Sequence, residues 1–172
     1  MKFPVNQAGR DWHFQDLMLH RVHEILLVAS PYDAFILEED GRLTAQILHE
    51  YLGMNLSYAP RVWQANTAAY AMDLLSRRSI DLIIVMLRIS DMDPVTFGTK
   101  VKELYKNKPI ILLAFDESEV KQLPDNIDEV IDNVFVWTGD SNVFPAIIKC
   151  IEDMKNVKRD IRKGNVRAIL FI

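Results

Sequence analysis

Three aspartates are the residues of this sequence best placed to do chemistry. Asp33 follows the apolar run 24–30, and Asp91 and Asp93 follow the largely apolar run 80–87. Carboxylates at neighbouring strand ends can hold a divalent cation or accept a phosphoryl group. Aspartate is equally common in such loops as a turn or cap residue. We favour turn and cap roles over a displaced phosphorylation or magnesium site, because no two of them sit together at a strand end.

The histidines do not complete a second site. A helix is expected over 11–22, and its continuation would place His13, His20 and His23 on one side, but no cysteine or regular carboxylate completes a ligand set. All four histidines precede residue 50, and no Ser-His-Asp or Cys-His arrangement is suggested. The glycines form no loop that would cradle a phosphate. We therefore expect no catalytic residue, no metal and no cofactor.

Composition narrows the class of protein. The 172 residues are 49% apolar and 26% charged, with a net charge of −4. This length suits one domain with one core, and the charge does not favour nucleic acid as a partner. The chain shows no apolar leader, and no run approaches the ~18 apolar residues that span a bilayer. The single Cys150 rules out an internal disulfide. A cytoplasmic location without membrane contact is expected.

Short apolar runs alternate with amphipathic segments about five times along the chain. Strands are expected at 24–30, 61–65, 80–87, 109–115 and 134–137. Helices are expected over 43–52, from a cap at Asn66 or Thr67 to Leu75, over 97–105, weakly over 117–122, and from Asn142 with Pro145 in the first turn. The alternation predicts an α/β fold, a doubly wound parallel five-stranded sheet of flavodoxin-like order 2-1-3-4-5. A long C-terminal helix completes it.

Sites in such sheets lie beyond the carboxyl ends of the strands, here at Ser30, Met86, Leu113 and Trp137. The stretch 80–94 resembles the third strand and following loop of response-regulator receiver (CheY-like) domains. In that family the residue that closes this strand is an aspartate that accepts a phosphoryl group. A thioether at Met86 has no nucleophilic oxygen and cannot form an acyl phosphate.

The resemblance implies neutral residues at the family's other phosphorylation positions as well. Its acidic pair corresponds to Ala29 and Ser30, its Thr or Ser after the fourth strand to Leu113, and its lysine after the fifth strand to Trp137. Phosphoryl acceptance needs an in-line carboxylate, a divalent cation and donors for the phosphoryl oxygens. The resemblance therefore implies a receiver-like domain that lacks the phosphorylation residues, a pseudo-receiver.

A second resemblance concerns the larger protein. Residues 25–43 and 131–139 are similar to a bacterial family of multidomain proteins. Those proteins carry receiver-like domains ahead of an ATP-binding domain of the pyruvate, phosphate dikinase or phosphoenolpyruvate synthase type. The similarity covers about residues 20–172, which contain none of that enzyme's nucleotide-binding or phosphohistidine motifs. It implies a non-enzymatic regulatory or assembly module that contacts proteins or neighbouring domains.

The expected organisation has three parts: an N-terminal extension (1–23), the receiver-like domain (24–155), and a helical linker that leads into a truncated following domain (156–172). Gly164 is the expected helix C-cap. The run 166–172 resembles this chain's own first strand; the alternative is an edge strand of the present domain.

The last helix carries a heptad pattern. Apolar residues recur at alternating spacings of four and three, while Ile148 and Ile151 are left to face the sheet. This seam predicts a parallel homodimer, and the alternative is a solvated linker. Its members are Val143, Ile147, Cys150, Met154, Val157 and Ile161.

Three functions compete. The first is a non-catalytic signalling or assembly module, and the second is a phosphoacceptor that uses a displaced aspartate. The third is a small-ligand sensor with a pocket lined by Met86, Leu113 and Trp137.

Overall fold

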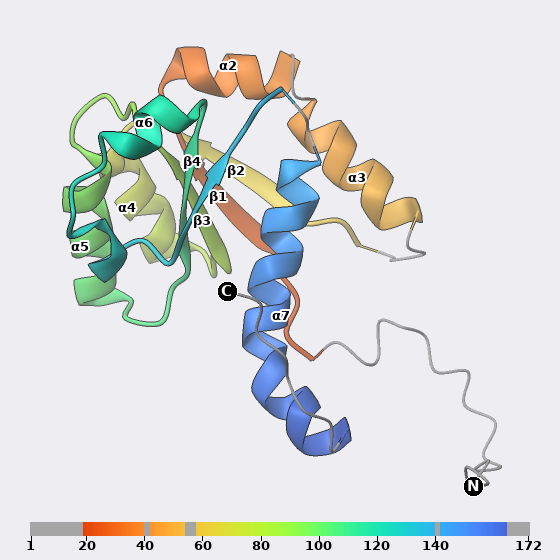
Figure 1. The fold of residues 1–172 in the computed structure, drawn as a ribbon. Coiled ribbons are helices and arrows are strands. Elements are labelled where there is room, and N and C mark those ends of the chain that lie inside the picture. Colours follow the sequence, from red (N-terminus) through yellow and green to blue (C-terminus); the bar gives the residue numbers. More distant parts are fainter. Residues whose placement is uncertain (1–18, 40–41, 54–57, 140–141, 165–172) are drawn as a thin grey trace, which may run out of the picture.

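The computed structural model describes residues 19–39, 42–53, 58–139 and 142–164 (Figure 1). In this part of the chain, five parallel strands form one sheet in the order β2-β1-β3-β4-β5. This confirms the predicted fold class and strand order. The strands are β1 (Glu24–Val28), β2 (Arg61–Ala65), β3 (Leu82–Met86), β4 (Ile110–Ala114) and β5 (Asn133–Val136).

The central strands are buried on both faces. Every residue of β3 and β4 is buried, which is why their sequences are unbroken apolar runs rather than alternating ones. Alternate side chains serve two separate cores. Ile84 and Met86 point into one core, whereas Ile83 and Val85 point into the other.

Helices cover both faces of the sheet (Figure 1). The core that contains Met86 is closed by α3 (Leu43–Gly53) and α7 (Val143–Gly164), and the opposite core by α4 (Ala68–Arg77) and α5 (Pro94–Leu104). The short α6 (Glu117–Lys121) and a 3-10 turn, η1 (Ile127–Glu129), link β4 to β5. The helices expected from residue 43 onward are confirmed, and the described part of α7 extends to Gly164.

A helix follows β1 where the sequence predicted a loop. This helix, α2 (Pro31–Glu39), lies across one end of the sheet instead of along a face (Figure 1). Only Asp33 and Leu37 are buried on it, while Tyr32 and Phe35 are exposed. Because its apolar residues do not gather on one side, it lacks the periodicity that marks an amphipathic helix.

The N-terminal segment packs against α7. The helix expected over 11–22 lies mostly outside the described residues, as does His13, and 19–23 is not helical. Leu19 is 61% exposed, whereas Val22 is buried. Asn156 of α7 holds the segment, accepting a hydrogen bond from the His20 backbone N–H (3.0 Å) and donating one to the His20 carbonyl (2.8 Å).

Glu152 of α7 is the second buried polar anchor of this segment. Its carboxylate accepts a hydrogen bond from the Val22 backbone N–H at 2.9 Å. The hydroxyl of Tyr51 on α3 lies 3.5 Å from the same oxygen. Burial raises the pKa of Tyr51, and the negative charge of Glu152 adds to that effect.

None of the described helices is both long and apolar enough to cross a bilayer.

Candidate functional site

The carboxyl ends of the strands meet beneath α2, where a flavodoxin-like sheet carries its site. Met86 closes β3 and pairs with Leu113 on β4. Met86 is 1% exposed and Leu113 is 0% exposed, so both belong to the apolar core. Neither side chain lines a cavity among those found in the described part of the chain. The predicted pocket between Met86, Leu113 and Trp137 is therefore not formed by the first two residues, because the sheet and α7 bury them.

Ala29 and Ser30 lock the end of β1 through backbone hydrogen bonds. The N–H of Ala29 donates to the Ala65 carbonyl at 3.1 Å, and the N–H of Ser30 donates to the Arg88 carbonyl at 2.8 Å. The hydroxyl of Ser30 accepts a hydrogen bond from the N–H of Asp33 at 3.1 Å. Ser30 therefore acts as the N-cap of α2, with Pro31 at the first helical position.

Asp33 forms a buried ion pair with Arg88. The Asp33 side chain is 0% exposed and that of Arg88 is 57% exposed. Arg88 Nε lies 3.3 Å from Asp33 Oδ2, and its terminal nitrogen lies 3.2 Å from Oδ1. The Nε contact is a hydrogen bond, whereas Oδ1 accepts none among the described residues and is held by charge alone. The hydrogen bond to Asp33 raises the pKa of Arg88. Asp33 thus lies in a helix and inside an ion pair, not in the loop predicted from the sequence.

Arg88 also contacts two elements beyond α2. Its guanidinium lies 5.3 Å from the centre of the Phe115 ring and 3.9 Å from a carboxylate oxygen of Glu119 on α6. The other oxygen of Glu119 accepts a hydrogen bond from the Phe115 N–H at 2.7 Å. Sequence reasoning missed Arg88 and Glu119. The one available signal was an arginine just beyond the central strand, with an aspartate just beyond the first.

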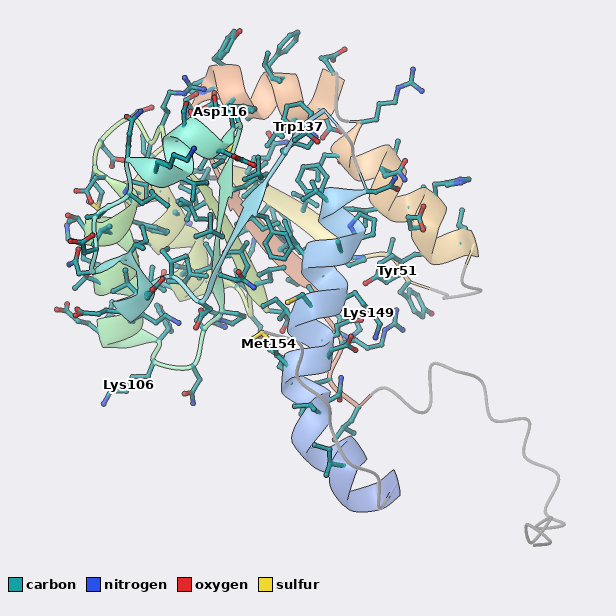
Figure 2. All side chains as sticks on the ribbon, viewed as in Figure 1. Tyr51, Lys106, Asp116, Trp137, Lys149 and Met154 are labelled. Carbon is teal, nitrogen blue, oxygen red and sulfur yellow. The ribbon has the colours of Figure 1, made fainter. Side chains whose placement is uncertain are left out.

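Trp137 forms the wall of a shallow cleft at this end of the sheet. The side chain is 6% exposed, and its ring lies 5.5 Å from that of Phe115. Its indole N–H is buried without a hydrogen-bond partner among the described residues. The adjoining cleft has a volume of about 290 Å³. Figure 2 shows Trp137 and Asp116 at this end of the molecule. The cleft is lined by Tyr32, Ile36, Arg88, Phe115, Asp116, Glu119 and Trp137.

Asp91 and Asp93 hold two helix N-termini. Asp91 accepts hydrogen bonds from the first two N–H groups of α4, at 2.6 and 3.0 Å. Asp93 caps α5, accepting from the N–H of Thr96 at 2.9 Å and from its hydroxyl at 2.6 Å. These hydrogen bonds lower the pKa of both carboxyls. Each of the three predicted aspartates therefore interacts with a different partner: Asp33 with Arg88, Asp91 with the start of α4, and Asp93 with the start of α5.

No group of three or more potential metal ligands comes together within the described ranges.

The structure shortens the predicted seam on α7. Ile147 lies in the core beside Ile148 and Ile151, so the expectation that it forms part of an outward seam is wrong. The face of a helix that packs on a sheet is broad enough to include it. Met154 and Val157 are 53% and 39% exposed. The stripe that remains, here called the α7 stripe, consists of Cys150, Met154, Val157 and Ile161, whereas Val143 packs at the rim of the core.

No protein-family model and no curated protein matches the sequence. Solved structures do match. The signal receiver domain of an HD domain-containing protein from Pseudomonas fluorescens Pf-5 superposes with a TM-score of 0.56. It is 24% identical and covers 83% of this chain and 95% of its own.

Two further structures carry the same fold. The receiver domain of a sensor histidine kinase from Pseudomonas aeruginosa PAO1, with magnesium in its active site cleft, gives a TM-score of 0.56 and 18% identity over 76% of this chain and 98% of its own. The response regulator TrrA from Thermotoga maritima, in complex with Mg²⁺ and BeF, gives 0.55 and 16% over 75% and 98%. At these identities the similarity shows the fold. The chain has the CheY-like fold of response-regulator receiver domains.

Proposed function

We propose that this chain is a non-catalytic, receiver-like regulatory or assembly module that acts in signal transduction through contacts with other proteins or neighbouring domains. One observation carries the proposal: the fully buried Asp33 carboxylate is paired with Arg88, while the strand ends beside it carry Met86 and Leu113. The receiver fold supports a signalling role, and the neutral strand ends argue against phosphoryl chemistry.

The chemical reason is a lack of free carboxylate at the strand ends. A phosphoacceptor needs a carboxylate in line with the phosphoryl donor and further oxygens for a divalent cation. Asp33 is occupied by a guanidinium, which also supplies positive charge where a cation would have to bind. Asp91 and Asp93 are occupied by helix N-termini. A displaced acceptor would have to give up one of these interactions.

The resemblance to multidomain proteins with a phosphoenolpyruvate synthase type domain fits this role. In that setting the chain is an N-terminal module of a cytoplasmic protein, and any phosphotransferase activity belongs to the parent protein. The domain boundaries proposed from the sequence, 24–155 with flanking segments, belong to the same proposal.

Intact-mass spectrometry after incubation with acetyl phosphate and Mg²⁺ tests the proposal. We expect no mass increase for the wild type. A gain of one phosphoryl group that Asp91→Asn or Asp93→Asn abolishes would establish the displaced phosphoacceptor instead. A matched incubation without Mg²⁺ separates Mg²⁺-dependent phosphoryl transfer from non-specific acylation by acetyl phosphate.

The cleft beside Trp137 favours a second candidate, a small-ligand sensor. Its aromatic wall and the unpartnered indole N–H suit a planar ligand that carries a hydrogen-bond acceptor. Screening small aromatic acceptors for a rise in melting temperature tests this candidate. A rise that Trp137→Phe removes would favour the sensor, because phenylalanine keeps the apolar wall and lacks the N–H.

A further inference from the structure

A second, larger groove lies where α2 meets the end of β2 and the start of α4. Its volume is about 520 Å³. Ala29, Ala34 and Ala65 are among its lining residues, and Ala29 and Ala65 are buried. The small side chains leave the hollow between the helix and the strand.

Two exposed aromatic rings line this groove. Phe35 of α2 is 63% exposed and Tyr70 of α4 is 49% exposed. Large apolar side chains that gather at a hollow on the surface mark a contact site more often than scattered ones do. The rings also present faces of negative potential, which attract cations.

The charge of the groove has one sign. Glu38 and Glu39 line it, and no lysine or arginine is among its described lining residues. Gln64 and Asn66 supply the remaining polar groups. Glu38 Oε2 accepts a hydrogen bond from the Thr44 hydroxyl at 3.2 Å, which orients that carboxylate. Acidic groups beside aromatic rings form a site for an ammonium or guanidinium group.

The neighbouring sheet edge indicates what kind of molecule carries that cation. Within the described chain, β2 pairs on one side only. The Arg61 N–H and the Ala65 carbonyl bond toward β1, so the alternation of the strand directs the backbone groups of Val62 and Gln64 toward the free edge. Gln64 therefore belongs both to this edge and to the groove. An extended peptide can use both at once.

We propose that the groove docks an extended basic segment of a partner protein, with a lysine or arginine side chain held against Phe35 and Tyr70 and paired with Glu38 and Glu39. This rests on the proposed function, since it names the surface through which such a module makes protein contacts.

Fluorescence anisotropy with a labelled short peptide of alternating arginine and valine tests the proposal. Glu38→Gln/Glu39→Gln should weaken binding about tenfold, because it removes both charges while residue 38 keeps an oxygen that accepts from Thr44. Glu103→Gln/Glu117→Gln removes the same charge from exposed positions outside the groove and should change binding little. Phe35→Ala/Tyr70→Ala should weaken binding as well, whereas the exposed Tyr32→Ala on the same helix should not.

Absence of peptide binding would overturn the docking proposal, and so would three further results. These are equal weakening by the groove and control pairs, equal binding of a glutamate-valine peptide, and full displacement of the peptide by arginine amide alone, which would make the groove a small-cation site. The phosphorylation assay stands apart from these outcomes. Phosphorylation with selective peptide binding removes the proposed function and leaves the docking, whereas absence of both removes the docking only.

Discussion

Asp33 carries a carboxylate with no exposed surface, and its only ionic partner among the described residues is a guanidinium that is more than half exposed. A buried carboxylate without a partner costs several kcal/mol or becomes protonated. Asp33 and Arg88 therefore depend on each other. Because Arg88 also contacts Phe115 and Glu119, the pair ties α2 to the loops after β3 and β4.

Removing the arginine tests this dependence. We expect Arg88→Ala to lower the free energy of unfolding by about 2–4 kcal/mol, less than for a pair buried on both sides because Arg88 is partly solvated. Arg88→Lys keeps the charge but loses the Nε hydrogen bond to Asp33, so its free energy of unfolding should lie between those of the wild type and Arg88→Ala. Urea unfolding measures the change. Equal stability of wild type and Arg88→Ala would show that Asp33 does not need the pair.

The variant Met86→Asp tests whether a carboxylate at the end of β3 is enough for phosphoryl acceptance. Met86→Asp should remain unphosphorylated by acetyl phosphate, because Ala29, Ser30 and Trp137 supply neither cation ligands nor a positive charge. The buried carboxylate should also destabilise the fold by about 2–4 kcal/mol. Met86→Leu, close in volume, is the control and should cost less than about 1.5 kcal/mol. If Met86→Asp were readily phosphorylated and as stable as the wild type, our assignment of the site would be wrong.

Asp91 and Asp93 predict a specific acid dependence. Hydrogen bonds lower the pKa of both carboxyls in the folded state, so their stabilisation is complete above the unfolded-chain value of about 4 and disappears as pH falls through the lower folded value. Asp91→Asn/Asp93→Asn keeps an acceptor at each helix and should lose less stability below pH ~4 than the wild type does. Urea unfolding between neutral and acidic pH measures this. The exposed Asp125→Asn controls for charge, and identical slopes for all three proteins would refute the assignment.

At the scale of elements, α7 is held to the domain by polar groups as well as by its apolar face. Asn156 is 4% exposed and bonds both backbone groups of His20 and the Glu152 carbonyl. Asn156→Ala should cost about 1–3 kcal/mol, since it leaves the backbone groups of His20 unpaired. Hydrogen exchange should accelerate at the His20 and Val22 amides. Asp153→Ala, which removes only a surface pair with Lys149, should leave those amides unchanged.

At the level of the whole molecule, the α7 stripe is the surface that we consider for self-association. Cys150 and Ile161 lie either side of the exposed Met154 and Val157 on a helix that extends beyond the sheet (Figure 1). We propose a parallel homodimer through this stripe, which is shorter than the seam predicted from the sequence. Met154→Glu/Val157→Glu should give a folded monomer by light scattering, because paired helices would bury two like charges each.

Leu48→Glu/Leu52→Glu is the matched control for the dimer. These leucines of α3 are 49% and 63% exposed, so the change in charge and apolar surface is comparable. The control should remain dimeric. A wild type that is monomeric at high micromolar concentration would leave α7 as a connector only.

The sheet and most of the helices follow from the pattern of apolar residues along the chain. Strands buried on both faces must be unbroken apolar runs, and β3 and β4 carry that signature without ambiguity. The alternation of strands and helices with short connections favoured the flavodoxin-like strand order. The neutral side chain of Met86 at the end of the third strand was also visible, since it depends only on where the strand stops.

The contacts that fill the site join residues far apart in the chain, and the sequence does not reveal them. Asp33 and Arg88 lie 55 positions apart, and nothing local to either indicates a partner, because an ion pair leaves no periodic pattern. The sequence did not reveal α2 for a related reason. This helix crosses the strand ends, so only Asp33 and Leu37 are buried on it, and no apolar stripe with helical spacing results. Likewise Ile147 and Met154 are equivalent in the heptad pattern, yet the sheet covers one and leaves the other exposed.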